Sequence, residues 1–256
     1  MATVLVTGST TGIGGETARL LAGRGHRVVL HARNERRAAD AAALVPQPAG
    51  VLVGDLASLA QTRDLAEKAF QYGPYDAIVH NAGVADPGAR VVTEDGLEQT
   101  FQVNVLAPYV LTALMPLPGR LIYLTSGMAD GGTIDLGDLQ RERRRWNANG
   151  AYCDSKLADL ALSYAVARHC PQVVSNAVCP GWVRSRMGGP SAPTDLRTGA
   201  ETQAWLAVTD DEPATRTGGY WRHMRPLPPL AGAVDVAVQD GLLAACAALS
   251  GVPFPG

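Results

Sequence analysis

Two side chains that stand four residues apart could carry out proton chemistry in this chain. Tyr152 and Lys156 precede apolar residues at helical spacing, so both side chains are expected on one face of a helix. A free tyrosine has a pKa of about 10, and a cation a few ångström away favours the phenolate form. Such a pair could move a proton on or off a carbonyl oxygen. The same spacing also occurs at the edge of ordinary amphipathic helices, so the rest of the sequence must distinguish a catalytic pair from an ordinary helix surface.

The composition limits the class of protein. The chain has 256 residues, enough for one large α/β domain or two small ones. A formal net charge of −2 gives no reason to expect nucleic acid or an anionic membrane as partner. No stretch approaches the ~20 apolar residues of a membrane span, and the dispersed cysteines predict neither a zinc site nor a disulfide framework. We expect a cytoplasmic protein without a metal, and we interpret the arginine-rich stretch Arg141–Arg145 as a solvated face.

Short apolar runs alternate with longer helical patterns along most of the chain. This alternation predicts an α/β fold in which helices cover both faces of a parallel sheet. The expected strands are Val4–Val6, Val28–Leu30, Val51–Val53, Ala77–Val79, Leu121–Leu124 and Val173–Val178. The expected helices are Gly14–Ala22, Arg36–Leu44, Ser58–Gln71, Leu97–Leu114, Tyr152–His169, Thr198–Val208 and Val234–Leu249. The segments Pro180–Pro193 and Thr215–Ala231 are expected to be loose because their patterns are weak and glycine or proline is frequent.

A glycine-rich stretch, Thr7–Gly14, joins the first expected strand to the first helix. Glycine permits positive φ and close approach of backbone N–H groups to a phosphate, and a helix N-terminus adds free donors. The spacing differs from the Gly-x-Gly-x-x-Gly fingerprint, and a P-loop is not supported because no Gly-Lys-Ser/Thr is present. A tight packing corner is the alternative, but the position after the first strand favours pyrophosphate binding. The expected cofactor contacts are Gly8, Thr10, Thr11, Gly12, Ile13 and Gly14.

The end of the second expected strand bears on the choice of dinucleotide. An NAD site has an acidic residue there for the ribose 2′-hydroxyl, whereas this chain has Arg33. A guanidinium suits a 2′-phosphate, so we predict NADP(H) rather than NAD(H); the alternative is an ordinary surface arginine. Asp55 and Leu56 end the third strand, where they are expected to contact the adenine. Helix capping is the competing role of Asp55 or Ser58.

Together these motifs resemble the short-chain dehydrogenase/reductase family over roughly Thr3 to Met187. The matching residues are Thr7–Gly14, Asp55, Asn81-Ala82-Gly83, Asn104, Ser126, Tyr152 with Lys156, and Pro180-Gly181. The chain is most similar to the retinol-dehydrogenase-like branch through Thr10–Gly14, Asp55–Leu59, Phe101–Asn104, Ser155–Ala158 and the long insertion between Ser126 and Tyr152. The resemblance implies a single Rossmann-type doubly wound domain over residues 1–256. Its cofactor half would end at about residue 125, and its catalytic and substrate half would follow.

The resemblance also implies an NADP(H)-dependent oxidoreductase that interconverts a ketone or aldehyde and an alcohol. Tyr152 would act as general acid or base, Lys156 would assist it and bind the nicotinamide ribose, and Ser126 would orient the reacting oxygen. Asn104 would hold a water that links Lys156 to solvent. Further cofactor contacts would come from Asn81, Ala82, Gly83, Pro180, Gly181 and Val183. Taken singly, several of these are also ordinary turn or bend residues.

Two residues depart from the family pattern. His80 stands where the family often has a second asparagine, which the backbone contacts there should tolerate. Asp154 adds a negative charge near the start of a helix, where the dipole favours it. Direct contact between Asp154 and Lys156 is not expected at a spacing of two residues.

Substrate choice is expected in the variable segments around the site, which are Met128–Asn149, Trp182–Thr198 and the chain near Tyr220–Pro229. They bring large apolar side chains, so the predicted substrate is a lipophilic small molecule. By resemblance, exposed faces of Leu97–Leu114 and Tyr152–His169 would form a homodimer or homotetramer. The main alternative is a non-catalytic dinucleotide-binding regulatory protein, but relatives of that kind generally lose the tyrosine or the lysine. An extended epimerase would need more chain than the ~70 residues that follow Pro180-Gly181.

Overall fold

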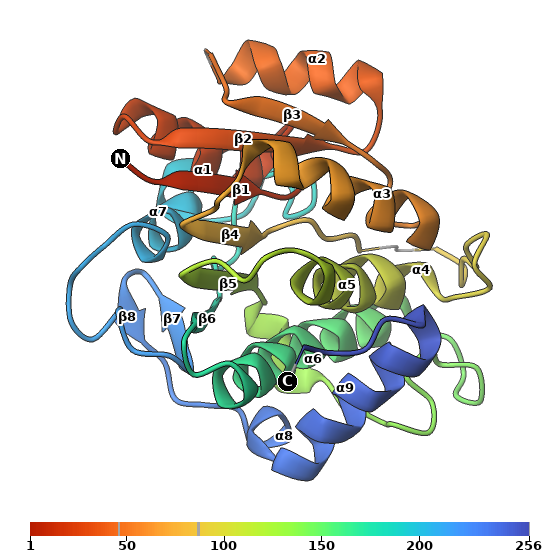
Figure 1. Ribbon diagram of the computed structural model, residues 1–256. Helices are drawn as coiled ribbons and strands as arrows, with labels where there is room; N and C mark the ends of the chain where they lie inside the picture. The colour runs from red at the N-terminus through yellow and green to blue at the C-terminus, as the bar shows by residue number, and fades with distance from the viewer. Residues whose placement is uncertain (46, 86–87, 256) are drawn as a thin grey trace.

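The computed structural model describes residues 1–45, 47–85 and 88–255, which form one sheet with helices on both faces (Figure 1). The strands are β1 (Thr3–Val6), β2 (Arg27–Ala32), β3 (Gly50–Val53), β4 (Ala77–His80), β5 (Arg120–Leu124), β6 (Val174–Val178), β7 (Gly219–Arg222) and β8 (Arg225–Pro226). The α-helices are α1 (Gly12–Gly23), α2 (Glu35–Leu44), α3 (Leu59–Ala69), α4 (Gln99–Phe101), α5 (Ala107–Leu114), α6 (Ala148–His169), α7 (Leu196–Leu206), α8 (Ala231–Val234) and α9 (Val236–Ser250). Two 3₁₀ turns, η1 (Phe70–Tyr72) and η3 (Gly127–Gly131), and a π-helical turn, η2 (Gln102–Leu106), complete the regular structure of these ranges.

The strand order is β3-β2-β1-β4-β5-β6-β7-β8, parallel except for the antiparallel β8. The chain leaves β1 towards one edge of the sheet and later returns to β4 on the other side of β1. The order therefore reverses between these strands, and ligands of such folds bind beyond the carboxyl ends near this point. The predicted motifs follow β1, β4, β5 and β6, so the topology gathers them at the carboxyl ends of the strands, which we call the carboxyl edge of the sheet.

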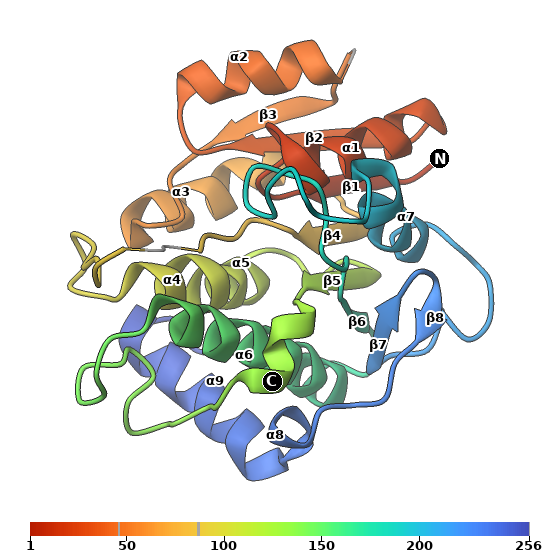
Figure 2. The same ribbon diagram turned by 180° about the vertical axis from the view of Figure 1, so that it is seen from behind.

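Helices cover the two faces of the sheet separately. Figure 1 shows α3, α5 and α6 in front of the strands, and Figure 2 shows α1 and α7 on the opposite face. Successive strand residues point to opposite faces. Leu5 accordingly packs with the α3, α5 and α6 layer, whereas Val4 and Val6 pack with the α1 and α7 layer. The predicted doubly wound Rossmann-type fold is confirmed.

The segment 215–231, expected to be loose, instead adds two strands to the sheet. β7 pairs in parallel with β6, with Tyr220 opposite Ala177, and β8 closes the edge as a short hairpin. Tyr220 and Trp221 are both buried, on opposite faces. A strand of four residues between glycine and arginine is too short to show a periodic pattern, so these strands were missed.

The outer side of α5 and α6 is covered by the chain itself. α9 packs along α6, away from the sheet (Figures 1 and 2), and buries Leu242 and Cys246. The tail that follows α9 reaches α5, where the Tyr109 hydroxyl donates to the Val252 carbonyl at 2.8 Å. No residue in Leu97–Leu114 is exposed, and in Tyr152–His169 only Arg168 and His169, at the end of the helix, are exposed. The expectation that these two helices present exposed faces is therefore wrong, and the oligomeric state stays a prediction without that basis.

Length and apolarity of helices bear on membrane insertion. Among the residues that the structure describes, no helix is both long and apolar enough to cross a bilayer.

The packing of α9 can be tested by removing one buried side chain. Leu242 is fully buried, so Leu242→Ala should lower the free energy of unfolding by about 2–5 kcal/mol. Val236 lies at the start of the same helix and is 50% exposed, so Val236→Ala should change it by no more than about 0.5 kcal/mol. Urea denaturation of both variants measures the difference. Equal losses would contradict the observed packing.

Candidate active site

The glycine-rich turn after β1 packs closely against the segment after β4. Gly8 and Gly12 have φ values of +63° and +61°, which favour glycine. A Cβ on Gly8 would lie 2.9 Å from the Ala82 Cα, and one on Gly14 would lie 2.2 Å from the Asn81 Nδ2. Any larger residue at position 8 or 14 would push the two segments apart. The structure thus brings together the predicted stretches 7–14 and 81–83.

Hydrogen bonds hold these two segments in register. The Asn81 Nδ2 donates to the carbonyls of Thr7 at 2.8 Å and Gly8 at 3.2 Å. The Thr7 hydroxyl accepts from the N–H groups of Asn81 at 2.9 Å and Ala82 at 3.0 Å. The Asn81 side chain therefore braces the turn, and the backbone of this segment is the part that can line a cofactor.

The start of α1 fits an anionic ligand. Thr11 occupies the N-cap position without a side-chain cap hydrogen bond, and the first turn has no acidic residue. The first bond of the helix runs from the Gly15 N–H to the Thr11 carbonyl, so the N–H groups before Gly15 have no partner within the helix. Such donors, together with the helix dipole, suit a pyrophosphate. No Cβ clash would occur at Gly12, where the surrounding 4 Å are open.

His31, which the sequence analysis did not single out, connects the turn to β3. Its Nδ1 accepts from the Gly8 N–H at 2.9 Å, and its Nε2 lies 2.9 Å from the Gly54 carbonyl. Because a carbonyl only accepts, these contacts require the neutral ring with its proton on Nε2. Burial lowers the pKa of His31 and favours this neutral form. A histidine two residues before Arg33, the predicted 2′-phosphate contact, was the available sequence signal.

Arg33 and Asp55 lie where a dinucleotide's adenosine end would be expected. Arg33 is exposed, and within the described ranges it has no ion pair, whereas Arg37 pairs with Asp40 at 3.3 Å. Asp55 accepts from the Ala57 N–H at 3.0 Å. It lines a surface hollow whose other walls are Ala57, Ser58, Gln61, Val91, Val92, Thr93, Glu94 and Gln99.

The predictions for the neighbours of Asp55 are resolved by the contacts. Ser58, not Asp55, caps α3 by accepting from the Gln61 N–H at 3.4 Å. Leu56 is only 4% exposed, so its side chain belongs to the core and only its backbone can face an adenine.

Lys156 is buried beneath the carboxyl end of β5. Its Nζ donates to the Leu124 carbonyl at 2.8 Å and to the Asp159 carboxylate at 2.7 Å. The same Nζ lies 5.9 Å from the centre of the Tyr152 ring, as the four-residue spacing predicts. A Cβ on Gly83 would lie 3.4 Å from this Nζ and 3.4 Å from the Asn104 Oδ1. Four predicted residues from three segments therefore meet at one place.

Burial and charge shift the ionisation of Lys156 and Asp159. Burial alone lowers the pKa of Lys156, but the negative charge and hydrogen bond of Asp159 outweigh it and raise that pKa. Burial raises the pKa of Asp159 to about 6, although Lys156 opposes this change. Asp159 was missed in the sequence, although a residue three positions after Lys156 shares its helix face.

Asn104 lies in the π-helical turn η2, a distortion that is frequent at functional sites. Its Oδ1 accepts from the Val84 N–H at 2.8 Å, and its Nδ2 donates to the Val84 carbonyl at 3.0 Å and the Ser155 Oγ at 2.9 Å. Ser155, also missed in the sequence, donates in turn to the Tyr152 carbonyl at 2.8 Å. The asparagine thus connects the segment after β4 to the helix that carries Tyr152.

Ser126 lies at the same edge of the sheet, just after β5. It begins η3, where its Oγ accepts from the Met128 N–H at 3.2 Å, and η3 packs against α6. The preceding residue fixes this position because the Thr125 hydroxyl donates to the Lys156 carbonyl at 2.5 Å.

Pro180, Gly181 and Val183 follow β6 at this edge. Gly181 has a φ of +86°, and a Cβ there would lie 3.4 Å from the Arg222 guanidinium. Val183 is 3% exposed and packs against Gly199, so its side chain belongs to the protein interior. As with Leu56, the backbone is the part of Val183 that can face a cofactor.

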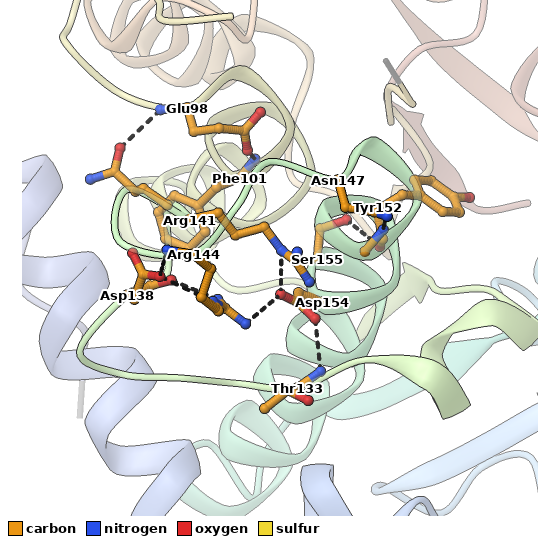
Figure 3. Close-up of polar contacts among 12 residues, drawn as sticks. Glu98, Phe101, Thr133, Asp138, Arg141, Arg144, Asn147, Tyr152, Asp154 and Ser155 are labelled. Carbon is orange, nitrogen blue, oxygen red and sulfur yellow. Dashed lines mark hydrogen bonds and ion pairs between the residues drawn. The ribbon is translucent and has the colours of Figure 1, made fainter. Parts of the chain in front are cut away.

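The insertion before Tyr152 is held to α6 by a network of charges (Figure 3). The Asp154 carboxylate accepts from the Arg141 Nε at 2.8 Å and the Thr133 N–H at 2.8 Å, and it lies 3.3 Å from the Arg144 Nη1. Figure 3 shows the Tyr152 ring pointing away from this network. The interpretation of the whole arginine-rich stretch as a solvated face is therefore wrong for Arg141 and Arg144, which are half-buried and paired.

Asp138 organises the turn that carries these arginines. Burial would raise its pKa, but backbone N–H groups of residues 142–144 and the Arg144 side chain bond its carboxylate and lower the pKa to about 2. The carboxylate therefore stays charged at any pH at which the protein would be assayed.

The large apolar side chains in and near the variable segments differ in exposure. Trp205 and Trp221 pack edge-to-face, 5.5 Å apart, in the core. Met128, Trp182 and Met187 follow Ser126 or Gly181 and are 43–57% exposed. These exposed side chains, like Leu136 and Met224 elsewhere in the variable segments, are available to meet a substrate.

The close contact of Gly14 with Asn81 generates a test by a single methyl group. Gly14→Ala should displace the turn and weaken dinucleotide binding about tenfold, because a Cβ there would overlap Asn81 and the Gly8 carbonyl. Gly23→Ala, in the same helix, meets nothing within 4 Å and should leave the affinity unchanged. Fluorescence titration with NADPH measures both variants. Similar affinities for the two variants would contradict this role of Gly14.

Curated proteins of similar sequence come from fungi, bacteria and animals. The chain is 40% identical to an uncharacterized oxidoreductase of Emericella nidulans, with 100% of both chains covered. It is 37% identical to DnrU of Streptomyces, described as a candidate daunorubicin C-13 ketoreductase, over 97% of this chain and 92% of that protein. Human retinol dehydrogenase 13 is 32% identical over 99% of this chain and 86% of its own. The predicted retinol-dehydrogenase-like relationship is confirmed.

Solved structures and a family model agree with these relatives. A Mycobacterium paratuberculosis protein of 26% identity superposes with a TM-score of 0.87, covering 100% of this chain and 96% of its own. A blue fluorescent protein from a metagenomic library, solved in complex with NADPH, has 28% identity and a TM-score of 0.69 over 86% of this chain and 95% of its own. The model described as short chain dehydrogenase matches residues 2–195. The chain therefore belongs to the short-chain dehydrogenase family and is an oxidoreductase of that family.

Proposed function

We propose that the protein is an NADP(H)-dependent oxidoreductase that interconverts a carbonyl group and an alcohol on a lipophilic small molecule. The observation that carries this proposal is the buried ammonium of Lys156, 5.9 Å from the Tyr152 ring at the carboxyl edge of the sheet. A buried cation beside a phenol is costly to maintain and is suited to proton transfer at that phenol.

The residues of the site account for the proton chemistry of the proposed reaction. A bound nicotinamide supplies or accepts the hydride. In reduction, the Tyr152 hydroxyl donates its proton to the carbonyl oxygen while the Ser126 hydroxyl holds that oxygen in place. The Lys156 charge stabilises the phenolate that remains. In oxidation the same phenolate takes the proton from the substrate hydroxyl.

The hydrogen-bond partners of Lys156 leave one of its donors available, which supports a route for the reaction's proton to exchange with solvent. The ammonium has three donors, of which Leu124 and Asp159 take two. The third can serve the nicotinamide ribose or a water held near Asn104, whose Oδ1 lies on the same side of Gly83 as the Lys156 Nζ. This remains the proposed role of Asn104.

A preference for NADP(H) is supported by charge at the end of β2. Arg33 is exposed and has no competing carboxylate in the described ranges, so it is free to meet a 2′-phosphate. The NADPH complex of the metagenomic relative agrees with this choice.

The substrate is proposed to be lipophilic because Met128, Trp182 and Met187 are exposed beside the motifs that follow β5 and β6. Two relatives are named after small organic molecules, retinol and daunorubicin. We divide the chain at about residue 125 into a cofactor half and a catalytic and substrate half. The described cysteines are all free, which supports the cytoplasm as the proposed location.

Removal of one hydroxyl group tests the proposed chemistry. Tyr152→Phe should lower turnover of NADPH with a panel of aldehydes, ketones and quinones by about 10²–10⁴-fold and leave NADPH affinity unchanged. Tyr164→Phe, a half-buried tyrosine of the same helix, is the control and should keep wild-type turnover. If wild-type protein binds NADPH but neither reduces a carbonyl nor oxidises the matching alcohols, the non-catalytic dinucleotide-binding alternative replaces this proposal.

The cofactor preference is tested at Arg33. Arg33→Ala should weaken NADPH binding about tenfold, because a charged hydrogen bond to the 2′-phosphate is lost, and should leave NADH binding unchanged. Arg27→Ala, at the other end of β2, should alter neither affinity. Equal affinities of the wild-type protein for NADH and NADPH would overturn the preference.

A further inference from the structure

Asp159 is a buried carboxylate that the proposed reaction does not use. It is 3% exposed, on the part of α6 that faces β5, and its Oδ2 lies 2.7 Å from the Lys156 Nζ. Lys156 is 4% exposed. A charged pair at this depth is energetically costly, because both groups have lost their hydration by bulk water. The pair is therefore a feature of the site that requires an explanation.

The surroundings of Asp159 contain few other charges. Lys156 and Tyr152 lie on its own helix, and Tyr123 faces it from β5, where the negative charge of Asp159 contributes to raising the pKa of that buried phenol. Burial is the larger cause of that rise. The Tyr123 hydroxyl is bonded to Thr112 at 2.9 Å, and Thr112 lies 3.1 Å from the Nε2 of His80. Burial also lowers the pKa of His80 to about 3, so this ring is neutral and Lys156 is the cation that Asp159 meets.

Geometry shows how Asp159 acts on the site. One Lys156 donor is directed to the Leu124 carbonyl and one to Asp159, so the ammonium has a fixed position between the end of β5 and the Gly83 backbone. Asp159 also adds a negative charge behind the cation. That charge opposes the effect of burial and favours the protonated form of Lys156.

We propose that Asp159 is a positioning residue of the active site, which fixes the Lys156 ammonium against β5 and keeps it charged beside Tyr152. This inference rests on the proposed function, because it assigns Tyr152 and Lys156 to proton transfer. Asp159 does not touch the substrate, and it acts only through Lys156.

Asp159→Asn tests the charge and keeps the shape. The Asn Oδ1 can still accept from Lys156, but the negative charge is gone. Burial then lowers the pKa of Lys156 without this opposition, so turnover should decline at alkaline pH, with the midpoint of the decline about one unit lower than in the wild type. Glu98→Gln is the matched control, since Glu98 is another buried carboxylate, 3% exposed, that caps α4. It should leave the pH midpoint unchanged, whereas an equal shift in both variants, or no shift in Asp159→Asn, would overturn the proposal.

Two further measurements cover the cases in which this comparison fails. If Asp159→Asn does not fold, Asp159→Glu keeps the charge and should retain the wild-type pH midpoint; a shift of about one unit in that variant would overturn the proposal.

If the wild-type protein turns over no substrate, the proposed function fails and NADPH affinity tests the role of Asp159 instead. Earlier loss of the Lys156 charge should weaken NADPH binding about threefold between about pH 7 and about pH 9 in Asp159→Asn and not in Glu98→Gln, and the same pH dependence in both variants would overturn the assignment.

Discussion

Burial of the Lys156 ammonium is the constraint on which the site depends. An ammonium removed from water needs acceptors in fixed positions, and the Leu124 carbonyl and Asp159 supply them at 2.8 and 2.7 Å. The first acceptor ties α6 to the end of β5, and the second lies on α6 itself. Thr125 adds a bond to the Lys156 carbonyl. The helix can therefore neither slide nor rotate relative to the sheet without leaving a charge unpaired, and this keeps Tyr152 at the sheet edge.

Local chemistry made much of this arrangement predictable from the sequence. The four-residue spacing of Tyr152 and Lys156 determines their shared helix face, and parallel topology determines that segments after β1, β4, β5 and β6 meet at one edge. The glycines at positions 8 and 14 indicated a close approach of backbones, which the contacts with Ala82 and Asn81 explain. These features depend on residue spacing and on single residue types, so they can be predicted without knowing which distant residues pack against them.

The sequence does not predict contacts between residues that are far apart in the chain and belong to no recognisable local pattern. Asp154 and Arg141 read as ordinary surface charges, because nothing in their spacing shows that the insertion folds back onto α6. The same reasoning applies to β7, whose four residues gain their strand conformation from pairing with β6 rather than from periodicity. The covering of α5 and α6 by α9 was missed because an apolar helix predicts burial but not its partner.

Under the proposed function, the position of Asp154 links substrate choice to proton transfer. Both ends of the insertion meet this carboxylate, through Thr133 on one side and through Arg141 and Arg144 on the other (Figure 3). Asp154 lies two residues after Tyr152, on the first turns of α6. A change of sequence within the insertion can therefore reshape the proposed substrate wall and still leave the insertion bound to the helix that carries the tyrosine. Loss of Asp154 would instead disturb both the insertion and Tyr152, because the insertion is bound to the same turns of α6 that carry the tyrosine.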